Sequence, residues 1–215
     1  ALGVVSACKG CHTDKSTTAL GADVQRMFGE LKPIPPAVEA LQRAQNGLTR
    51  AESARLLLNP DERHTQALFA GMAWFLDHHL TYDMIDLERD VIMRLERLTR
   101  HQDDDVAAIA LASLHLARGS EPRSRRFLTA TLHPLGEREA RVRARWGVVM
   151  GYLADKARGT GDAAGAAALY RRAREVDPTN ARVPLNLGLA LNDALDHAGA
   201  IEAYQQSLAL DAAQP

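Results

Sequence analysis

The sequence has few cysteines, no long apolar run and almost no net charge, and each absence narrows what the chain can be. The only two cysteines are Cys8 and Cys11, so there is no second Cys pair of the kind that a four-ligand zinc site usually needs. No apolar run approaches the roughly 20 residues that span a bilayer. A formal net charge of −1 argues against nucleic acid as the main partner. Catalytic triads, paired acid–base carboxylates in a recognisable motif and phosphate-binding glycine loops are also missing.

What remains is an ordinary globular composition. A chain of 215 residues can bury a sizeable core as one domain or two. Its residues are 46% hydrophobic and 25% charged, as in typical soluble proteins.

The most informative stretch is Cys8-Lys9-Gly10-Cys11-His12. Two cysteines separated by two residues can form thioether bonds with both vinyl groups of one porphyrin, and the next residue projects its imidazole at the iron from the same side. Gly10 has no Cβ, which lets the turn between the thiols lie flat against the macrocycle. The motif predicts one covalently attached haem c, with Cys8 and Cys11 as attachment residues and His12 as an axial iron ligand.

Three other uses of the two thiols compete with haem attachment. A zinc site lacks its second ligand pair, because the remaining histidines are scattered. A thioredoxin-like dithiol would follow a strand of a βαβ unit, and no strand pattern is found. A disulfide across so tight a loop would leave His12 unexplained. The pattern favours haem c over all three.

The sequence does not single out the second axial ligand. The pair His78 and His79 is preferred, because it ends an apolar helix predicted over 67–80, where one ring could turn inward. Five-coordinate iron and a ligand from another chain stay open as alternatives. The full set of candidates is His64, His78, His79, His101, His115, His133, His197, Met27, Met72 and Met84.

Seven residues before the motif cannot enclose a porphyrin, which is a large apolar plate. We therefore expect the rest of the chain, a partner or a domain outside this sequence to cover the haem. Haem c attachment implies a periplasmic or extracellular location. The chain begins Ala1-Leu2-Gly3 without the charged start of a signal peptide, so we expect a mature product, or a piece of one, whose targeting signal has been removed.

The rest of the chain shows helical periodicity and no alternating strand pattern, which predicts an all-α fold. Prolines at 33, 35 and 36 form a break, and Asp103 to Asp105 are placed to cap a helix N-terminus. Trp74 and Trp146 are expected to be core anchors. Helices are predicted over 17–31, 37–45, 49–58, 62–79, 83–100, 104–117 and 122–132.

From Gly147 the sequence repeats itself with a period of 34 residues. Asn186-Leu187-Gly188 provides the small residue at which paired helices approach closely. The period is that of tetratricopeptide repeats, and two copies are expected to stack on the helices before them. The corresponding pairs are Leu153 and Leu187, Ala166 and Ala200, Tyr170 and Tyr204, and Asp177 and Asp211.

Arginines are concentrated between 118 and 145, together with a few glutamates. The simpler interpretation is a solvated helix face with ion pairs, and the sharper one is a docking surface for an acidic partner or for haem propionates. The set is Arg118, Arg123, Arg125, Arg126, Arg138, Arg141, Arg143 and Arg145.

With both ends considered, the chain resembles the carboxyl-terminal part of multihaem c-type cytochromes that carry tetratricopeptide repeats. The matching residues are Ser6-Ala7-Cys8-Lys9-Gly10-Cys11-His12-Thr13-Asp14-Lys15 and the repeats at 147–212. The resemblance implies haem electron transfer outside the cytoplasm. The chain departs from the family because it has one haem motif, whereas members of the family have several further haem motifs upstream.

These observations predict three segments and one main function. The segments are a haem c segment with one helix at 1–35, degenerate helical hairpins at 36–146 and two repeats at 147–215. The function is an electron-carrying c-type cytochrome subunit with a repeat solenoid for docking or assembly. We expect it to bind other cytochrome subunits or redox proteins in a homo- or hetero-oligomer, even a filament. A repeat scaffold with a structural haem, or a haem oxidoreductase or sensor subunit, is the alternative.

Overall fold

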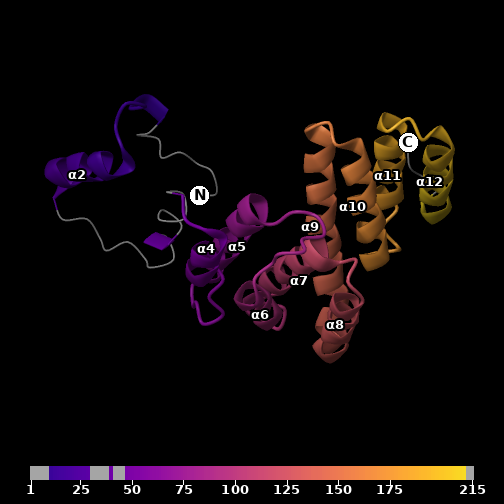
Figure 1. Cartoon of the computed structure of the whole chain (residues 1–215), viewed down its shortest axis with the longest axis horizontal. Helices are drawn as coiled ribbons and strands as arrows, with labels where there is room; N and C mark the ends of the chain where they lie inside the picture. Colours follow the sequence, from indigo (N-terminus) through magenta and orange to yellow (C-terminus); the bar gives the residue numbers. More distant parts are fainter. Residues whose placement is uncertain (1–9, 30–38, 41–46, 212–215) are drawn as a thin grey trace.

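The computed structural model describes residues 10–29, 39–40 and 47–211 (Figure 1). Every regular element in this part of the chain is a helix, which confirms the all-α prediction. The expected helix at 37–45 and the boundary at 35/36 lie outside the described residues, apart from positions 39 and 40. The helices are α2 (Thr17–Phe28), α4 (Arg50–Leu57), α5 (Thr65–His79), α6 (Arg89–Leu98), α7 (Asp104–Arg118), α8 (Pro122–Leu132), α9 (Glu139–Gly159), α10 (Ala163–Val176), α11 (Arg182–Asp193) and α12 (His197–Leu210), with a 3-10 turn η1 (His133–Arg138) before α9.

Helix α7 is the centre of the core. Each of its residues from Val106 to Ala117 is buried, and the helix packs against α5, α6, α8 and α9. A helix that is apolar on all sides can only be stable when neighbours surround it. Its N-terminus is capped as predicted, because the Asp103 carboxylate accepts hydrogen bonds from the backbone N–H groups of Asp105 and Val106 at 2.9 and 3.0 Å.

Helices α9 to α12 form two consecutive hairpins that repeat the same local geometry 34 positions apart. Asp162 caps α10 by accepting from Gly165 N at 2.8 Å, and Asp196 caps α12 by accepting from Gly199 N at 3.0 Å. At Gly188 an added Cβ would lie 2.3 Å from the Tyr204 ring, so only glycine admits that side chain.

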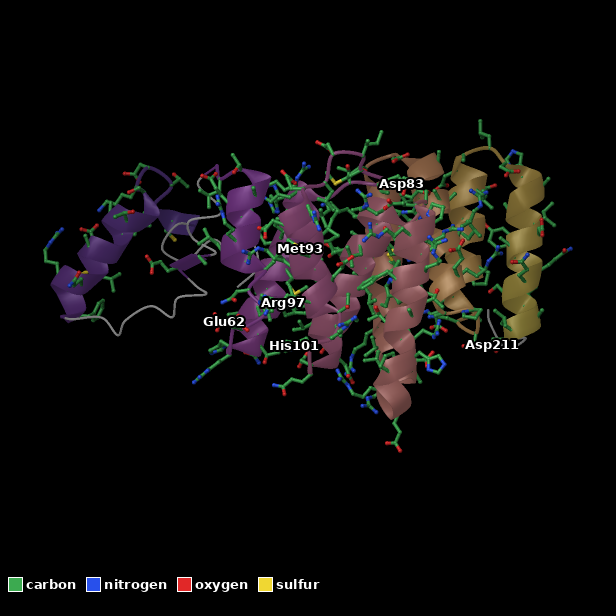
Figure 2. The ribbon with its side chains drawn as sticks, turned by 60° about the horizontal axis from the view of Figure 1, so that its bottom comes forward. Glu62, Asp83, Met93, Arg97, His101 and Asp211 are labelled. Atoms are coloured by element: carbon green, nitrogen blue, oxygen red, sulfur yellow. The ribbon has the colours of Figure 1, made fainter. Side chains whose placement is uncertain are left out.

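The predicted helix at 83–100 is wrong in its first turns, because α6 begins only at Arg89. Asp83 has a φ of 50°, and Met84 N donates to Ala117 O at 2.6 Å. The segment before α6 is therefore a loop tied to the end of α7. Figure 2 shows Asp83 at the upper edge of the helices.

Other helix ends and boundaries differ less from their predicted positions. α2 stops at Phe28, where Gly29 has a φ of 81°, three residues before the expected end. α5 begins at Thr65 rather than at Glu62. The expected boundary at 146/147 falls inside α9. Trp146 is buried as predicted, whereas Trp74 is half-buried against the core. None of the described helices is both long and apolar enough to cross a bilayer, as the sequence predicts.

Candidate haem attachment segment and the residues around it

The second half of the motif lies at the surface, immediately before α2. Cys11 ends a short helical turn, and both Cys11 and His12 are exposed; Cys8 lies outside the described residues. Among the described residues, none lies within 4 Å of a Cβ added to Gly10. Covalent haem needs an accessible thiol and imidazole on adjacent residues, and Cys11 and His12 fit this requirement.

Two contacts hold His12 against α2. Lys15 N donates to His12 O at 3.3 Å, and the Lys15 ammonium bonds Asp23 of α2 at 2.7 Å. Ser16 caps the helix by accepting from Ala19 N at 3.1 Å. The hydrogen bond and the charge of Lys15 lower the pKa of Asp23, so its carboxylate stays ionised near neutral pH. Lys15 therefore links His12 to α2.

An apolar surface accompanies the motif on α2. Met27 and Phe28 are 67% and 77% exposed at its C-terminal end. Figure 1 shows α2 at one end of the molecule, away from α7 and α9. The described part of the chain thus presents Cys11, His12 and these two side chains to solvent.

His78 and His79, the preferred second ligands, occupy different environments at the end of α5. His78 is exposed, its ring stacks on Trp74 with centroids 4.2 Å apart, and its Nδ1 lies 2.8 Å from Trp74 O. A carbonyl oxygen only accepts, so Nδ1 is the donor and Nε2 of the neutral ring keeps its lone pair. A ring held in this way is prepared to ligate a metal through Nε2.

His79 is engaged on its other nitrogen. Its Nε2 lies 2.9 Å from the hydroxyl of buried Ser53, and its ring packs against Trp74 and Phe75. Burial lowers the pKa of His79, and the neighbouring His78 lowers it further. Ligation through Nε2 would break the bond to Ser53. Of the two candidates, the geometry favours His78.

The remaining candidates differ mainly in burial. Met72 is in the core with 1% exposure, and His115 is buried at 4%. The Met84 sulfur accepts from Thr81 N at 3.4 Å, and His101 Nδ1 accepts from Asp103 N at 3.0 Å. Exposed candidates are Met27, His64, His133 and His197.

The described arginines between 118 and 145 mostly form ion pairs, which agrees with the simpler of the two interpretations. Asp104 alone receives Arg138 at 2.8 Å, Arg141 at 2.9 Å and Arg145 at 3.0 Å. The hydrogen bonds from Arg141 and then Arg138 lower the pKa of Asp104. Arg118, Arg125 and Arg143 pair with Glu121, Glu175 and Glu139.

Sequence reasoning missed Arg172, a charged side chain of α10 that binds both the end of α7 and the loop before α6. It is 3% exposed, donates to the carbonyls of His115 and Leu116 at 2.7 and 3.0 Å, and bonds both oxygens of Asp83 at 2.6 and 2.7 Å. A signal was present, because Arg172 shares a helix face with buried Leu169 and Val176, three residues before and four after it.

In the part of the chain that the structure describes, no three His, Cys, Asp or Glu side chains gather into a metal-binding group. Comparisons with known protein families, with curated proteins and with solved structures found no match.

Proposed function

We propose that this chain is an extracytoplasmic c-type cytochrome subunit that carries electrons through one haem bound covalently to Cys8 and Cys11. The observation that carries the proposal is the motif itself, together with the exposed position of Cys11 and His12. When bound, the haem supplies one-electron redox chemistry. His12 provides one axial ligand and Lys15 keeps it anchored to α2.

His78 is the second axial ligand in this proposal. Its Nδ1–H is fixed on Trp74 O, and the stacked indole holds the ring in one orientation. This leaves its Nε2 to bind the iron, whereas Nε2 of His79 is engaged by Ser53. A histidine in this place would give a lower reduction potential than a methionine.

The helices serve as a docking and assembly body with tetratricopeptide-like repeats. The recurrence of the Asp162 and Asp196 caps supports this, as does the close approach of Gly188 and Tyr204. The chain would then bind other cytochrome subunits or redox proteins in the periplasm or outside the cell.

A pyridine haemochrome spectrum of protein made with the cytochrome c maturation machinery tests the haem directly. The wild type should give the spectrum of covalently attached haem c, and Cys8→Ala with Cys11→Ala should abolish it. His64→Ala, which changes an exposed histidine remote in sequence from the motif, is the matched control and should leave haem incorporation unchanged. Haem-free wild type under the same conditions would overturn the proposal.

Visible spectra of both redox states then test the second ligand. His78→Ala should convert a six-coordinate spectrum into one that changes when carbon monoxide is added to the reduced protein, whereas His79→Ala should not. An unchanged spectrum in His78→Ala would exclude His78. Carbon monoxide binding by the wild type would favour an oxidoreductase or sensor over a carrier.

A second candidate is an interaction scaffold with a structural haem. Val148 and Tyr152 lie one turn apart on α9 and are 66% and 62% exposed, which offers an apolar surface for a peptide. Partner binding that survives Cys8→Ala with Cys11→Ala, and is lost in Val148→Asp, would favour this scaffold.

A further inference from the structure

Helix α8 carries three arginines on the face that it turns away from the core, and Figure 1 shows this helix at the lower edge of the molecule. Arg123, Arg125 and Arg126 are all exposed, whereas Leu128 on the opposite side is 3% exposed. With 3.6 residues per turn, Arg126 lies in the middle of the free face, between the other two arginines. The sequence has no acidic residue from 122 to 136. These three side chains form the α8 arginine face.

Neighbouring carboxylates leave most of this charge unbalanced. Arg125 lies 3.6 Å from Glu175, a carboxylate that is itself 54% exposed. The other two arginines of the face form no salt bridge with any residue that the structure describes. Glu121, the carboxylate nearest to them in the sequence, is bound by Arg118 at 2.6 Å. The face therefore keeps a net positive charge in the folded chain.

The arginines do not stabilise the helix that carries them. The N-terminal end of a helix dipole is positive, so cationic side chains in the first turns are unfavourable there. Helix α7 has Asp104 and Asp105 in its first turn, whereas the first turn of α8 has no acidic residue, and Glu121 forms no side-chain cap. Residues that break a local rule without a compensating contact mark functional sites. The charge becomes favourable only when an anionic group binds to it.

The distribution of charge along the chain limits the size of that anionic group. Residues 118–145 contain eight arginines and three glutamates, a formal charge of +5, while the whole chain carries −1. The rest of the chain therefore carries −6 and repels an extended polyanion such as nucleic acid. Helix α8 has 11 residues and is about 16 Å long, which an extended segment of about five residues spans. The face fits a short acidic segment.

A membrane surface suits the face less well than a protein does. Helices that bind membranes insert large apolar side chains beside their basic residues. From 118 to 147, where every residue is described, no large apolar side chain is exposed. We propose that the α8 arginine face docks a short acidic segment of a partner protein, whose carboxylates bind the guanidinium groups. The proposal does not depend on the haem.

Binding of a fluorescein-labelled hexaglutamate peptide to the full chain, measured by anisotropy at low salt, tests the proposal. Arg123→Gln with Arg126→Gln should weaken binding by about tenfold, and added salt should weaken binding by the wild type. Arg63→Gln with Arg182→Gln is the matched control, because it removes the same charge from exposed arginines elsewhere. This control should keep the affinity of the wild type.

Thermal unfolding shows whether the variants keep the fold. Arg123→Gln with Arg126→Gln should be at least as stable as the wild type, because it removes positive charge from the positive end of the α8 dipole. Phosphatidylglycerol vesicles and a single-stranded DNA oligonucleotide are measured beside the peptide. A wild type that does not bind the peptide, equal losses in the two double variants, or tighter binding of the vesicles or the DNA would overturn the proposal.

Discussion

Two buried polar residues, His115 and Arg172, join the central helix α7 to the hairpins that follow it. His115 lies edge-on to Trp146 of α9 with ring centroids 5.3 Å apart, and its Nε2 is 4.0 Å from Glu175 of α10. Within the described part of the chain, His115 Nδ1 and Trp146 Nε1 have no hydrogen-bond partner. Burial, and after it the positive charges of Arg172 and Arg125, together lower the pKa of His115 to about 4.

Acid should therefore destabilise the fold through His115. Its pKa is near 6.5 in the unfolded chain and about 4 in the folded one, so the unfolded state binds the proton first as the pH falls. The contribution of His115 to stability is fully present above pH 6.5, and it is lost as the pH falls from 6.5 to about 4. We expect the wild type to lose about 2 kcal/mol between pH 7 and pH 5 through this group alone.

Urea unfolding of wild type and His115→Phe at the two pH values checks this. Between pH 7 and pH 5, the free energy of unfolding of His115→Phe should fall by about 2 kcal/mol less than that of the wild type. His115→Gln is a second replacement of similar size. Parallel pH dependence in all three proteins would contradict the assignment. Asp83 and Asp104 have lowered pKa values, so their own losses fall at more acidic pH.

Removing Arg172 should be strongly destabilising. Its guanidinium satisfies two carbonyls of α7 and both oxygens of Asp83, and its face covers the Tyr82 ring at 3.9 Å. Arg172→Met removes the cationic partner of Asp83, whose carboxylate then keeps only the hydrogen bonds from Ser120. We expect a loss of about 3–5 kcal/mol in the free energy of unfolding.

A double-mutant cycle with Asp83→Asn separates the ion pair from the carbonyl bonds. Asparagine tolerates the φ of 50° at this position, so the backbone is unchanged. The double variant should be clearly more stable than the sum of the two single losses predicts. Strict additivity would show that the two side chains do not act as a pair.

At the scale of helices and turns, the 34-residue repeat gives an internal comparison. The turn before α10 has Gly161 with a φ of 86°, and the turn before α12 has Leu195 with a φ of 63°. This left-handed backbone is free of strain for glycine and costs about 1–2 kcal/mol for other residues. Leu195 is 78% exposed, so it gains little from packing in the isolated chain.

Exchanging these residues should move stability in opposite directions. Leu195→Gly relieves the backbone but adds entropy to the unfolded chain, and we expect a net gain of about 0.5 kcal/mol. Gly161→Leu should lose about 1 kcal/mol. Thermal unfolding of both variants measures the change in stability relative to the wild type. Changes in the same direction would show that the two turns are not equivalent.

The sequence predicted helices and caps well wherever the signal was local. Asp103 is the clearest case, since a carboxylate before an apolar run has one favourable use. The start of α6 was missed because Met84 and Leu87 match a helical pattern, while the carboxylate of Asp83 is bound by Arg172, 89 residues away. A bond between residues so far apart in the chain does not alter the local spacing of apolar residues from which helices are predicted.

At the scale of the whole molecule, α2, which follows the cysteine motif, lies at one end and α12 lies at the other (Figure 1). The residue types of the motif could be interpreted from sequence, because two thiols and an imidazole at this spacing suit few ligands. The choice between His78 and His79 could not, because it depends on which ring nitrogen Trp74 and Ser53 engage. Burial likewise separates core Met72 from exposed Met27.

The intact mass of the denatured protein, produced in a periplasm with haem c maturation, tests the central claim most directly. Thioether bonds survive unfolding, so the account predicts the mass of the chain plus one haem, with neither Cys8 nor Cys11 available to a thiol reagent. A chain at its bare mass of 23.4 kDa, with both thiols reactive, would contradict it.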